Sequence, residues 1–395
     1  KKVIGTDEDG NETETYELAT TVYGEELEWV SDGTVKNIKG LLWGNYILRE
    51  VSAPEGYMIA EDIPFTITNE LKLEVDTYTM VDEPTEVEIS KTDITTGEEL
   101  PGATLRVLRR TEAADGTEIE ELVTTIYGEE LEWVSGEEPK VIKGLPAGDY
   151  ILREVSAPNG YTVTEDVTFT ITDELKPAET VVMEDAPSAV TISKVDIKNT
   201  DQELPGATLQ ILDANEDVVR TIYGERLEWT STEDAKVILG LQDGTYILRE
   251  TSAPAGFTVA EDVTFTVELG HVTDTDADTV TMTNCANVLN ISKTDITSGE
   301  ELPGATLQIL KKVTGEDGTE TEEIAATVYG EKLEWVSGEE PKVIEGLPAG
   351  EYILREITAP NGYTVAEDVA FTVDENMSVT LPAETVTMEN APTEI

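Results

Sequence analysis

The sequence is poor in residues that support sulfur, metal or histidine chemistry. Its 395 residues include one cysteine, Cys285, and one histidine, His271. A single cysteine excludes a framework of disulfide bonds within the chain. No spacing typical of a metal site or an enzyme nucleophile accompanies the histidine. We therefore expect no metal, no cofactor and no turnover enzyme.

Long apolar runs are also missing. No segment approaches the roughly 18 consecutive apolar residues that indicate a membrane-spanning helix. The chain does not open with the basic, apolar and small-residue series of a signal peptide. Even so, 39% of the residues are hydrophobic, which is enough to build cores. The sequence predicts folded domains without membrane contact in this segment.

Basic residues are scarce: 26 Lys and Arg face 83 Asp and Glu, for a formal charge of −57. Binding to nucleic acid requires clustered cations that release counterions from phosphates, so this partner is excluded. The acidic residues are dispersed among apolar ones, which predicts solvated strand and loop faces instead of an acidic tail.

The sequence is rich in internal repetition. The series Ile-Ser-Lys-x-Asp places a lysine at Lys91, recurs 103 residues later at Lys194, and recurs again 99 residues later at Lys293. A period near 100 residues is a domain length, longer than a solenoid repeat. The chain therefore divides into four repeats, at residues 1–84, 85–187, 188–286 and 287–395.

The two ends of the chain differ from this plan. Repeat one is expected to lack its opening strand, because Lys1 and Lys2 align with Lys311 and Lys312 inside repeat four. The last residues are expected to begin a further strand. Each closing motif is followed by a lysine motif only nine residues later, as from Asp185 to Lys194, so we expect repeats held end to end without flexible tethers.

Strands are predicted almost everywhere. Segments such as Val-Thr-Phe-Thr-Ile-Thr at 167–172 alternate with period two and are rich in β-branched and aromatic residues. Turn signals recur between them. Leu-Pro-Gly-Ala at 100–103 suits a type II turn, and Ala-Pro-x-Gly, as at 157–160, suits type I. The fold class is therefore all-β.

Two further positions recur with the lysine. A glutamate ends each Tyr-Ile-Leu-Arg-Glu series, and an aspartate or asparagine closes each repeat. The glutamates are Glu50, Glu154, Glu250 and Glu356, and the closing residues are Asp82, Asp185, Asn284 and Asn390.

Strand alternation predicts that all three types of side chain point into the core. Lys194 shares a strand face with Val190 and Ile192, and the closing residues follow apolar residues at alternate positions. In the glutamate strand, Arg153 occupies the opposite face from Glu154. Because arginine is the costlier side chain to bury, the glutamate is predicted to be the inward one.

Burial changes what such groups can do. Desolvation lowers the pKa of a lysine and raises the pKa of a glutamate. A neutral amine can attack the side-chain carbonyl of Asp or Asn while a protonated glutamate polarises that carbonyl and transfers protons. The product is an amide between side chains, formed with loss of water from Asp or ammonia from Asn.

The alternative is a buried ion pair of the lysine with two acids. Such a pair costs desolvation and contributes little net stability. It also accounts poorly for Asn284 and Asn390 as third members, whereas an acyl acceptor accommodates either Asp or Asn.

Together these motifs resemble a known family over nearly the whole chain. Ile-Ser-Lys-x-Asp, Leu-Pro-Gly-Ala-Thr, Tyr-x-Leu-x-Glu-x-x-Ala-Pro-x-Gly-Tyr and the terminal Val-x-Met-x-Asp/Asn are similar to the collagen-adhesin B-region domains, also called Cna-B or SpaA-like. The resemblance implies tandem β-sandwich domains of inverse-immunoglobulin, prealbumin-like topology, arranged end to end.

The resemblance also implies intramolecular isopeptide bonds in which the glutamate is catalytic. The expected pairs are Lys91–Asp185, Lys194–Asn284 and Lys293–Asn390. Repeat one offers Glu50 and Asp82 without a visible lysine, so no bond is assigned to it.

The resemblance implies an extracellular structural segment of a Gram-positive cell surface, attached to the cell wall or part of a filament. Its partners are expected to be further repeats of the array, neighbouring filament subunits or a host surface ligand. The sequence has neither a Tyr-Pro-Lys pilin motif nor a Leu-Pro-x-Thr-Gly sorting signal. A covalently polymerised pilus shaft is therefore not expected from this segment.

A second function remains open, in which the repeats bind host or cell-surface molecules directly. Tryptophan is the candidate contact residue, at Trp29, Trp133, Trp229 and Trp335. Each lies in the same Tyr-Gly-Glu-x-Leu-Glu-Trp series, and recurrence in every repeat favours packing over a binding site.

Overall fold

A computed structural model describes residues 1–6, 12–70, 76–112, 115–273, 275, 277–314, 320–374 and 384–393. The chain forms two compact units. One contains Lys1–Pro158 with Val163–Asp185, and the other contains Asn159–Thr162 with Ala186–Ile395. In these described ranges every regular element is a strand, and no helix is long and apolar enough to cross a membrane. The all-β prediction is confirmed.

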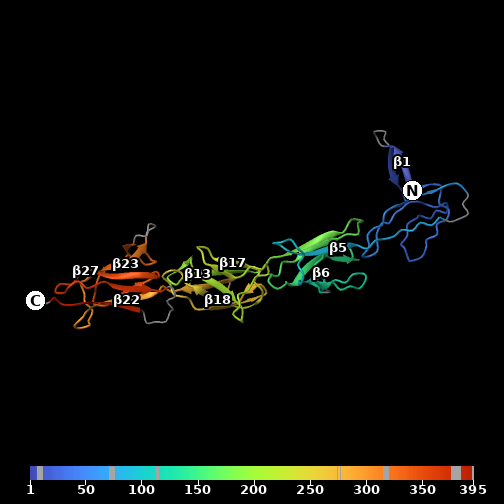
Figure 1. Ribbon diagram of the computed structural model, residues 1–395. Coiled ribbons are helices and arrows are strands. Elements are labelled where there is room, and N and C mark those ends of the chain that lie inside the picture. The colour runs from blue at the N-terminus through green and yellow to red at the C-terminus, as the bar shows by residue number, and fades with distance from the viewer. Residues whose placement is uncertain are drawn as a thin grey trace. The chain divides into compact units, whose positions relative to one another are not determined.

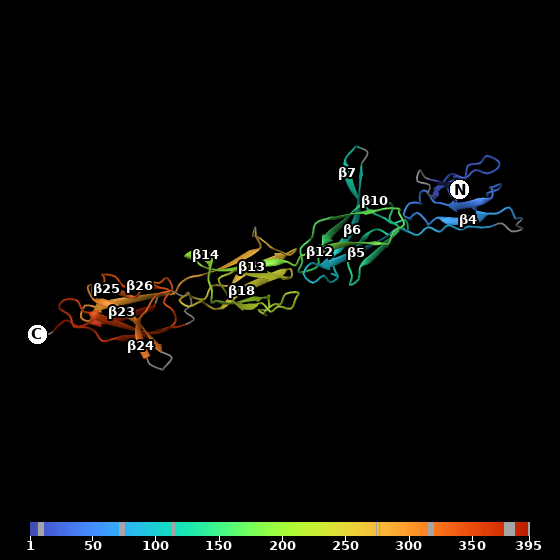
Figure 2. The ribbon, with the colours of Figure 1, turned by 90° about the horizontal axis from the view of Figure 1, so that it is seen from above.

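Repeat two consists of two sheets. One has the order β12-β5-β9, and the other has the order β11-β10-β6-β7 with β8 also paired to β6. Figure 2 shows these strands together, with the β7 hairpin projecting from β6. The strands are β5 (Glu86–Asp93), β6 (Thr104–Glu112), β7 (Glu118–Leu122), β8 (Glu132–Val134), β9 (Lys140–Lys143), β10 (Gly148–Ser156), β11 (Val167–Ile171) and β12 (Glu179–Asp185).

Repeat three follows a similar plan; its strands β13, β17 and β18 are labelled in Figure 1. In its first sheet β13 pairs with β14, β17 and β21, and its second sheet has the order β16-β15-β18-β19-β20. The strands are β13 (Ala189–Asp196), β14 (Asn199–Glu203), β15 (Thr208–Leu212), β16 (Glu228–Thr230), β17 (Lys236–Leu239), β18 (Gly244–Ser252), β19 (Val263–Glu268), β20 (His271–Val272) and β21 (Thr279–Asn284).

Repeat four repeats the arrangement of repeat two. Its sheets have the orders β26-β22-β29 and β24-β23-β27-β28, with β25 also paired to β23. The strands are β22 (Val288–Asp295), β23 (Thr306–Thr314), β24 (Glu320–Ile324), β25 (Glu334–Val336), β26 (Lys342–Glu345), β27 (Gly350–Thr358), β28 (Val369–Val373) and β29 (Glu384–Asn390).

A separate core fills each of these three repeats. Alternate residues of facing strands supply it, since successive side chains of a strand point to opposite faces. In repeat two, Val87 and Ile89 of β5 pack in one cluster with Leu105 of β6 and Leu152 of β10. The recurring tryptophan, here Trp133, is partly buried against that cluster. Its place against the core supports the packing interpretation.

The first and last strands of a repeat are parallel neighbours. In repeat two β5 pairs with β12, and Lys91 lies opposite Met183 in the register. Repeats three and four have the same parallel pairs, β13 with β21 and β22 with β29. The two ends of each repeat sequence therefore meet in one sheet, which brings the closing residue to the lysine strand.

Repeat one contains only two small hairpins in its described part. They consist of β1 (Lys2–Thr6) with β2 (Glu12–Tyr16) and β3 (Gly44–Leu48) with β4 (Ile63–Ile67). Residues 76–82, which correspond to a closing strand, form no strand. In the other repeats the closing strand pairs with the first strand alone, and in the described part of residues 1–84 no strand pairs with 76–82.

One turn prediction is wrong. In the Ala-Pro-x-Gly series, the hydrogen bond that closes the turn runs from Tyr57 N to Pro54 O at 3.1 Å. This places Gly56 at the third position of the turn, with a φ of 77°. A positive φ at that position is typical of type II rather than type I. The glycine is needed there because other residues rarely adopt this conformation.

The connection between repeats three and four is hydrogen-bonded to both repeats. Asn287 N donates to Gly256 O of repeat three at 2.9 Å. The buried Asn287 side chain accepts from Leu347 N at 2.9 Å and donates to Leu347 O at 2.8 Å, both in repeat four. Tyr329 Oη also donates to Asp196 Oδ2 at 2.9 Å. These bonds agree with a connection that is not a flexible tether.

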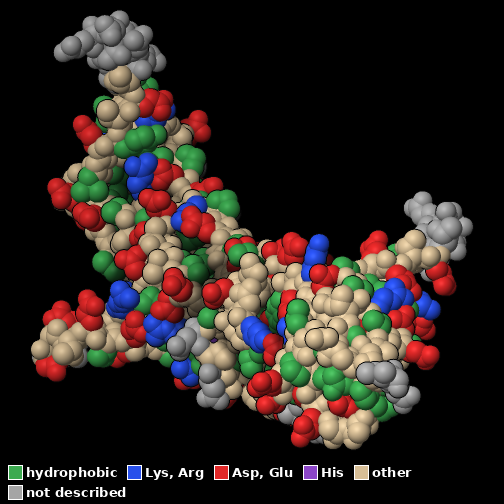
Figure 3. Space-filling model, turned by 90° about the vertical axis from the view of Figure 1, so that its left-hand side faces the viewer, with side chains coloured by type: hydrophobic (Ala, Val, Ile, Leu, Met, Phe, Trp, Pro, Cys, Tyr) green, Lys and Arg blue, Asp and Glu red, His purple; other side chains and the backbone are tan. Residues whose placement is uncertain are grey.

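Acidic side chains are dispersed over the face of the molecule that Figure 3 shows. Figure 3 shows Asp and Glu scattered over the visible face among apolar and basic side chains. Many of the exposed acids pair with the few basic residues, as Glu129 does with Lys140 at 2.7 Å. Such exposed pairs contribute little stability. The main effect of the negative net charge is therefore to keep the protein soluble through repulsion between molecules.

Candidate functional site

In repeat two the three predicted side chains meet inside the sandwich. Lys91, Glu154 and Asp185 are each at most 4% exposed. Lys91 Nζ contacts Asp185 Oδ1 and lies 3.3 Å from Glu154 Oε1. The lysine and the aspartate come from adjacent strands of one sheet, and the glutamate comes from β10 of the facing sheet.

Repeat three brings together Lys194, Glu250 and Asn284, all buried. Lys194 Nζ lies 3.2 Å from Glu250 Oε1. Asn284 Nδ2 donates to Glu250 Oε2 at 2.8 Å and to Thr258 O at 2.7 Å. The glutamate therefore contacts both the amine and the amide.

Repeat four has the same arrangement with Lys293, Glu356 and Asn390, all buried. Lys293 Nζ lies 3.6 Å from Glu356 Oε1. Asn390 Nδ2 donates to Glu356 Oε1 at 2.9 Å and to Glu356 Oε2 at 3.1 Å. All three copies of the site place the lysine beside the glutamate, and in repeats three and four the glutamate also accepts from the asparagine amide.

Each glutamate is held by a backbone amide ten residues further along the chain. Glu154 Oε2 accepts from Thr164 N at 2.8 Å, and Glu250 Oε2 accepts from Ala260 N at 2.6 Å. The preceding arginine points outward, as Arg153 does in its two-oxygen contact with Asp166. The inward glutamate and the outward arginine agree with the predicted faces.

Burial perturbs the titration of the site. Desolvation raises the pKa of Asp185 to about 7, although Lys91 opposes the shift. Desolvation also lowers the pKa of Lys194 and of Lys293, and the neighbouring glutamate opposes it in each case. The uncharged forms of acid and amine are therefore favoured relative to water.

Several buried polar atoms of the site have no directed hydrogen-bond partner among the described residues. They include Lys194 Nζ and Asn284 Oδ1 in repeat three, and Lys293 Nζ and Asn390 Oδ1 in repeat four. Buried polar atoms without partners are costly and rare in native proteins. In both repeats the atoms without a directed hydrogen bond include the amine and the carbonyl oxygen of the group it would attack.

Repeat one has only part of this arrangement. Glu50 Oε2 accepts from Ala60 N at 2.7 Å, as the other glutamates do from their own partners. Asp82 is half-buried and lies outside any strand. Residues 1–84 contain no Ile-Ser-Lys strand that could supply the amine.

Sequence analysis missed a second recurring glutamate. Glu203 Oε2 accepts from the backbone N of Lys194 at 2.8 Å, and its Oε1 accepts from Ser193 Oγ at 2.6 Å. Glu99 and Glu301 make the same pair of bonds in their own repeats. The available signal was the recurrence of Glu directly before Leu-Pro-Gly-Ala.

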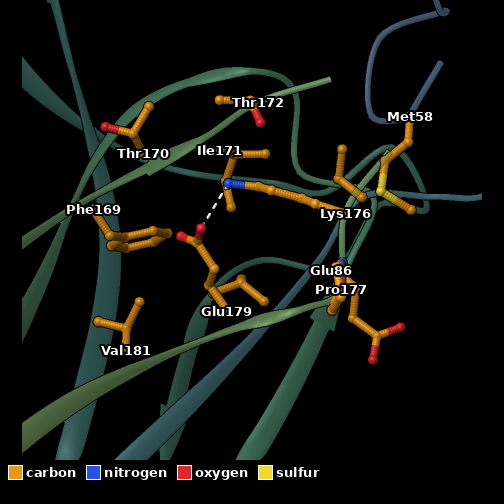
Figure 4. A pocket seen from close by; sticks show the side chains of 12 residues that line it. Met58, Glu86, Phe169, Thr170, Ile171, Thr172, Lys176, Pro177, Glu179 and Val181 are labelled. Carbon is orange, nitrogen blue, oxygen red and sulfur yellow. Dashed lines mark hydrogen bonds and ion pairs between the residues drawn. The ribbon is translucent and has the colours of Figure 1, made fainter. Parts of the chain in front are cut away.

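The remaining candidates lie apart from these sites. His271 is exposed, with its Nδ1 3.0 Å from Asp278 Oδ2, and Cys285 is exposed as a free thiol. Within the ranges that the structure describes, no three His, Cys, Asp or Glu side chains are grouped as a metal would require. The pocket of Figure 4 contains the Lys176–Glu179 ion pair at 2.7 Å and no member of the three sites.

Several solved structures resemble parts of the chain. They include the Bacillus anthracis TIE protein, with 18% identity over 95% of this chain and 66% of that chain, at a TM-score of 0.39. A streptococcal ancillary pilin has 18% identity over 78% of this chain and 100% of its own, at 0.33. BcpA, the major pilin subunit of Bacillus cereus, has 15% identity over 78% and 99%, at 0.34.

No curated protein matches the chain. The family model for the SpaA prealbumin-like fold domain, in contrast, matches residues 3–80, 85–187, 188–284 and 287–387. These four matches cover most of the sequence and agree with the two-sheet repeats and their parallel first and last strands. The chain therefore belongs to the family of SpaA prealbumin-like fold domains.

Proposed function

We propose that the chain is a tension-bearing segment of a bacterial surface stalk or filament, and that repeats two to four each close an intramolecular isopeptide bond. The observation that carries this proposal is the buried lysine, glutamate and Asp or Asn found three times between first strand, last strand and facing sheet. Membership of the family of SpaA prealbumin-like fold domains supports the surface role.

The chemistry starts from an uncharged amine. Nζ of the lysine attacks Cγ of the Asp or Asn, and the Nζ–Cγ bond forms as the carbonyl becomes a tetrahedral intermediate. The protonated glutamate donates to the carbonyl oxygen in this step and then moves a proton from nitrogen to the leaving group. The Cγ–O bond of Asp185 breaks to release water, and the Cγ–N bond of Asn284 or Asn390 breaks to release ammonia.

The location of the glutamate supports this role. In repeat four, Glu356 lies within 3.6 Å of Lys293 Nζ and within hydrogen-bond distance of Asn390 Nδ2. One carboxyl group therefore contacts both the nucleophile and the leaving group. Because the site acts once and its product is the protein itself, the chain is not a turnover enzyme.

The mechanical role follows from which strands the bond joins. Lys91 lies near the start of repeat two and Asp185 lies at its end, 94 positions further along the chain. Tension that enters the first strand passes through the amide to the last strand and bypasses everything between. Each bonded repeat then resists extension even if its hydrogen bonds break.

This role places the segment outside the cell, at the surface of a Gram-positive bacterium, with further repeats or filament subunits as its partners. The direct test is peptide mapping of the purified chain by mass spectrometry. Branched peptides that join Lys91 to Asp185, Lys194 to Asn284 and Lys293 to Asn390 are expected. Recovery of these six residues only in linear, unmodified peptides would refute the proposal.

A further inference from the structure

The antiparallel strand beside each reactive lysine ends before it reaches the lysine. In repeat three β13 pairs with β17, and the last pair on this edge is Ile192 with Lys236. Lys194 lies two residues further along. The corresponding last pairs are Ile89 with Lys140 in repeat two and Ile291 with Lys342 in repeat four. On this edge β17, β9 and β26 therefore stop short of the lysine, and in repeat three β14 pairs with β13 only beyond it, from Val195 onward.

A Glu-Leu dipeptide bonds the lysine at this point, and in repeat three its glutamate is the last residue of β14. Lys194 N donates to Glu203 Oε2 at 2.8 Å, and Leu204 N donates to Lys194 O at 2.6 Å. The same two bonds hold Lys91 through Glu99 and Leu100, and Lys293 through Glu301 and Leu302. A carboxylate therefore acts where a ladder would place a backbone carbonyl.

The second carboxylate oxygen is also engaged. Glu203 Oε1 accepts from Ser193 Oγ, the residue before the lysine, at 2.6 Å. Hydrogen bonds to a carboxylate are stronger than neutral ones, and two bonds to one carboxylate fix its orientation. The backbone on both sides of the lysine α-carbon is fixed as a result.

This geometry matters because the lysine side chain is long and flexible. Its amine reaches the acceptor only if its α-carbon is held, and a misplacement of about 1 Å can cost a reaction about 100-fold. The charge that acts on Lys194 Nζ comes from Glu250 in the facing sheet. The second glutamate instead contacts the lysine backbone.

We propose that Glu99, Glu203 and Glu301 are positioning residues for isopeptide formation, which hold the backbone of the reactive lysine so that its amine meets the acceptor. The inference rests on the proposed function. It separates two glutamates per repeat, one that transfers protons and one that sets geometry.

The two roles make opposite predictions for glutamine. In Glu301→Gln the amide oxygen can accept from Lys293 N while the amide nitrogen donates to Ser292 Oγ, so positioning survives without charge. In Glu356→Gln the proton-transferring carboxyl is lost and no bond is expected. Glu301→Ala removes both contacts and leaves the lysine backbone unsupported.

The test uses the full chain, made by pulsed cell-free synthesis and sampled over time. Branched peptides report bond formation separately in each repeat, so repeats two and three are internal controls for variants in repeat four. Glu301→Ala is expected to slow the Lys293–Asn390 bond by about 10- to 100-fold. Glu301→Gln is expected to restore the rate to within about 3-fold of the unsubstituted chain.

Three results would overturn the proposal. They are an unchanged rate in Glu301→Ala, a Glu301→Gln rate as low as that of Glu301→Ala, and an unchanged rate in Ser292→Ala. Ser292→Ala removes only the hydroxyl that orients the carboxylate. It therefore tests the positioning role even if hydrogen exchange shows that Glu301→Ala leaves repeat four unfolded. Absence of all three bonds from the unsubstituted chain is a different outcome, because it refutes the proposed function as well.

Discussion

Lys91 lies opposite Met183 in the parallel pair of β5 and β12. Asp185 is therefore one pleat further along the same face of the sheet, beside the lysine. A slip of one residue would turn Asp185 to the other face, so the register of two strands from opposite ends of the repeat sets the reactive pair.

The position of the bond predicts the response of repeat two to force. A single molecule of the full chain, pulled from its ends, is expected to show no extension from the segment between Lys91 and Asp185, which are 94 positions apart. Glu154→Gln is expected to leave the bond unmade and to add an unfolding step of about 300 Å, since an extended residue spans about 3.4 Å. Glu165→Gln, an exposed change on the same repeat, is the control and should behave as the unsubstituted chain.

The same variant reports the thermodynamic effect of the bond. Closing a loop of 94 residues restricts the unfolded chain by about 4 to 5 kcal/mol if a disulfide of that loop length is a fair guide. Hydrogen exchange of the core amides of repeat two should show a loss of this size in Glu154→Gln, while the amides of repeat four stay unchanged. Equal protection in the variant and the unsubstituted chain would show that the bond contributes nothing to stability.

The acceptors predict different pH dependences for bond formation. Burial raises the pKa of Asp185 to about 7 from 3.8, so its carboxyl keeps a proton up to about pH 7, and the hydroxyl of that protonated carboxyl can leave as water. Before the bond forms, the contribution of this protonated carboxyl to the free energy of unfolding of repeat two is fully present below pH 3.8. It is lost as the pH rises through about 7. The rate in repeat two should therefore fall above about pH 7.

Asn284 and Asn390 need no such proton. The rates of bond formation in repeats three and four should not fall above pH 7. They should fall instead at low pH, where Lys194 and Lys293 become protonated. Because the pKa of both lysines is lowered, their amines stay uncharged, and reactive, to a lower pH than that of an ordinary lysine. Pulsed synthesis followed by peptide mapping at several pH values measures all three rates in one chain. Parallel pH profiles for the Asp and Asn repeats would contradict this assignment.

The connection between repeats three and four gives a prediction about the joint itself. Asn287→Ala should remove both side-chain bonds to Leu347 and lower the opening free energy of Leu347 N by about 1 to 3 kcal/mol. Asn287→Ser should cost less, because Ser188 at the same position of repeat three donates to Leu241 O at 2.7 Å. Hydrogen exchange at Leu347 measures both. Equal losses in the two variants would show that the hydroxyl cannot replace the amide.

Sequence reasoning reached the fold class and the faces of the key strands because both depend on local alternation. Lys194 follows Ile192, and Asp185 follows Met183, at alternate positions, and burial of these side chains needs no knowledge of the partner strand. The parallel pairing of β13 with β21 could not be predicted in this way, since it joins segments about 90 residues apart.

Two other features depended on geometry that the sequence does not display. The turn at Gly56 closes through Tyr57 N, one residue beyond the Ala-Pro-x-Gly series, and this changed its type. Glu203 is preceded by polar residues, a pattern that predicts a solvated side chain. Its role as an acceptor for Lys194 N appears only when the early end of β17 is known.

The intact mass of the purified chain tests the central claim most directly. Repeat two should lose one water, and repeats three and four should lose one ammonia each, whereas residues 1–84 should lose nothing because they supply no lysine strand. The expected mass lies below that of the sequence by one water and two ammonia molecules, with one ammonia regained in Glu250→Ala. A mass equal to that of the unmodified sequence would contradict it.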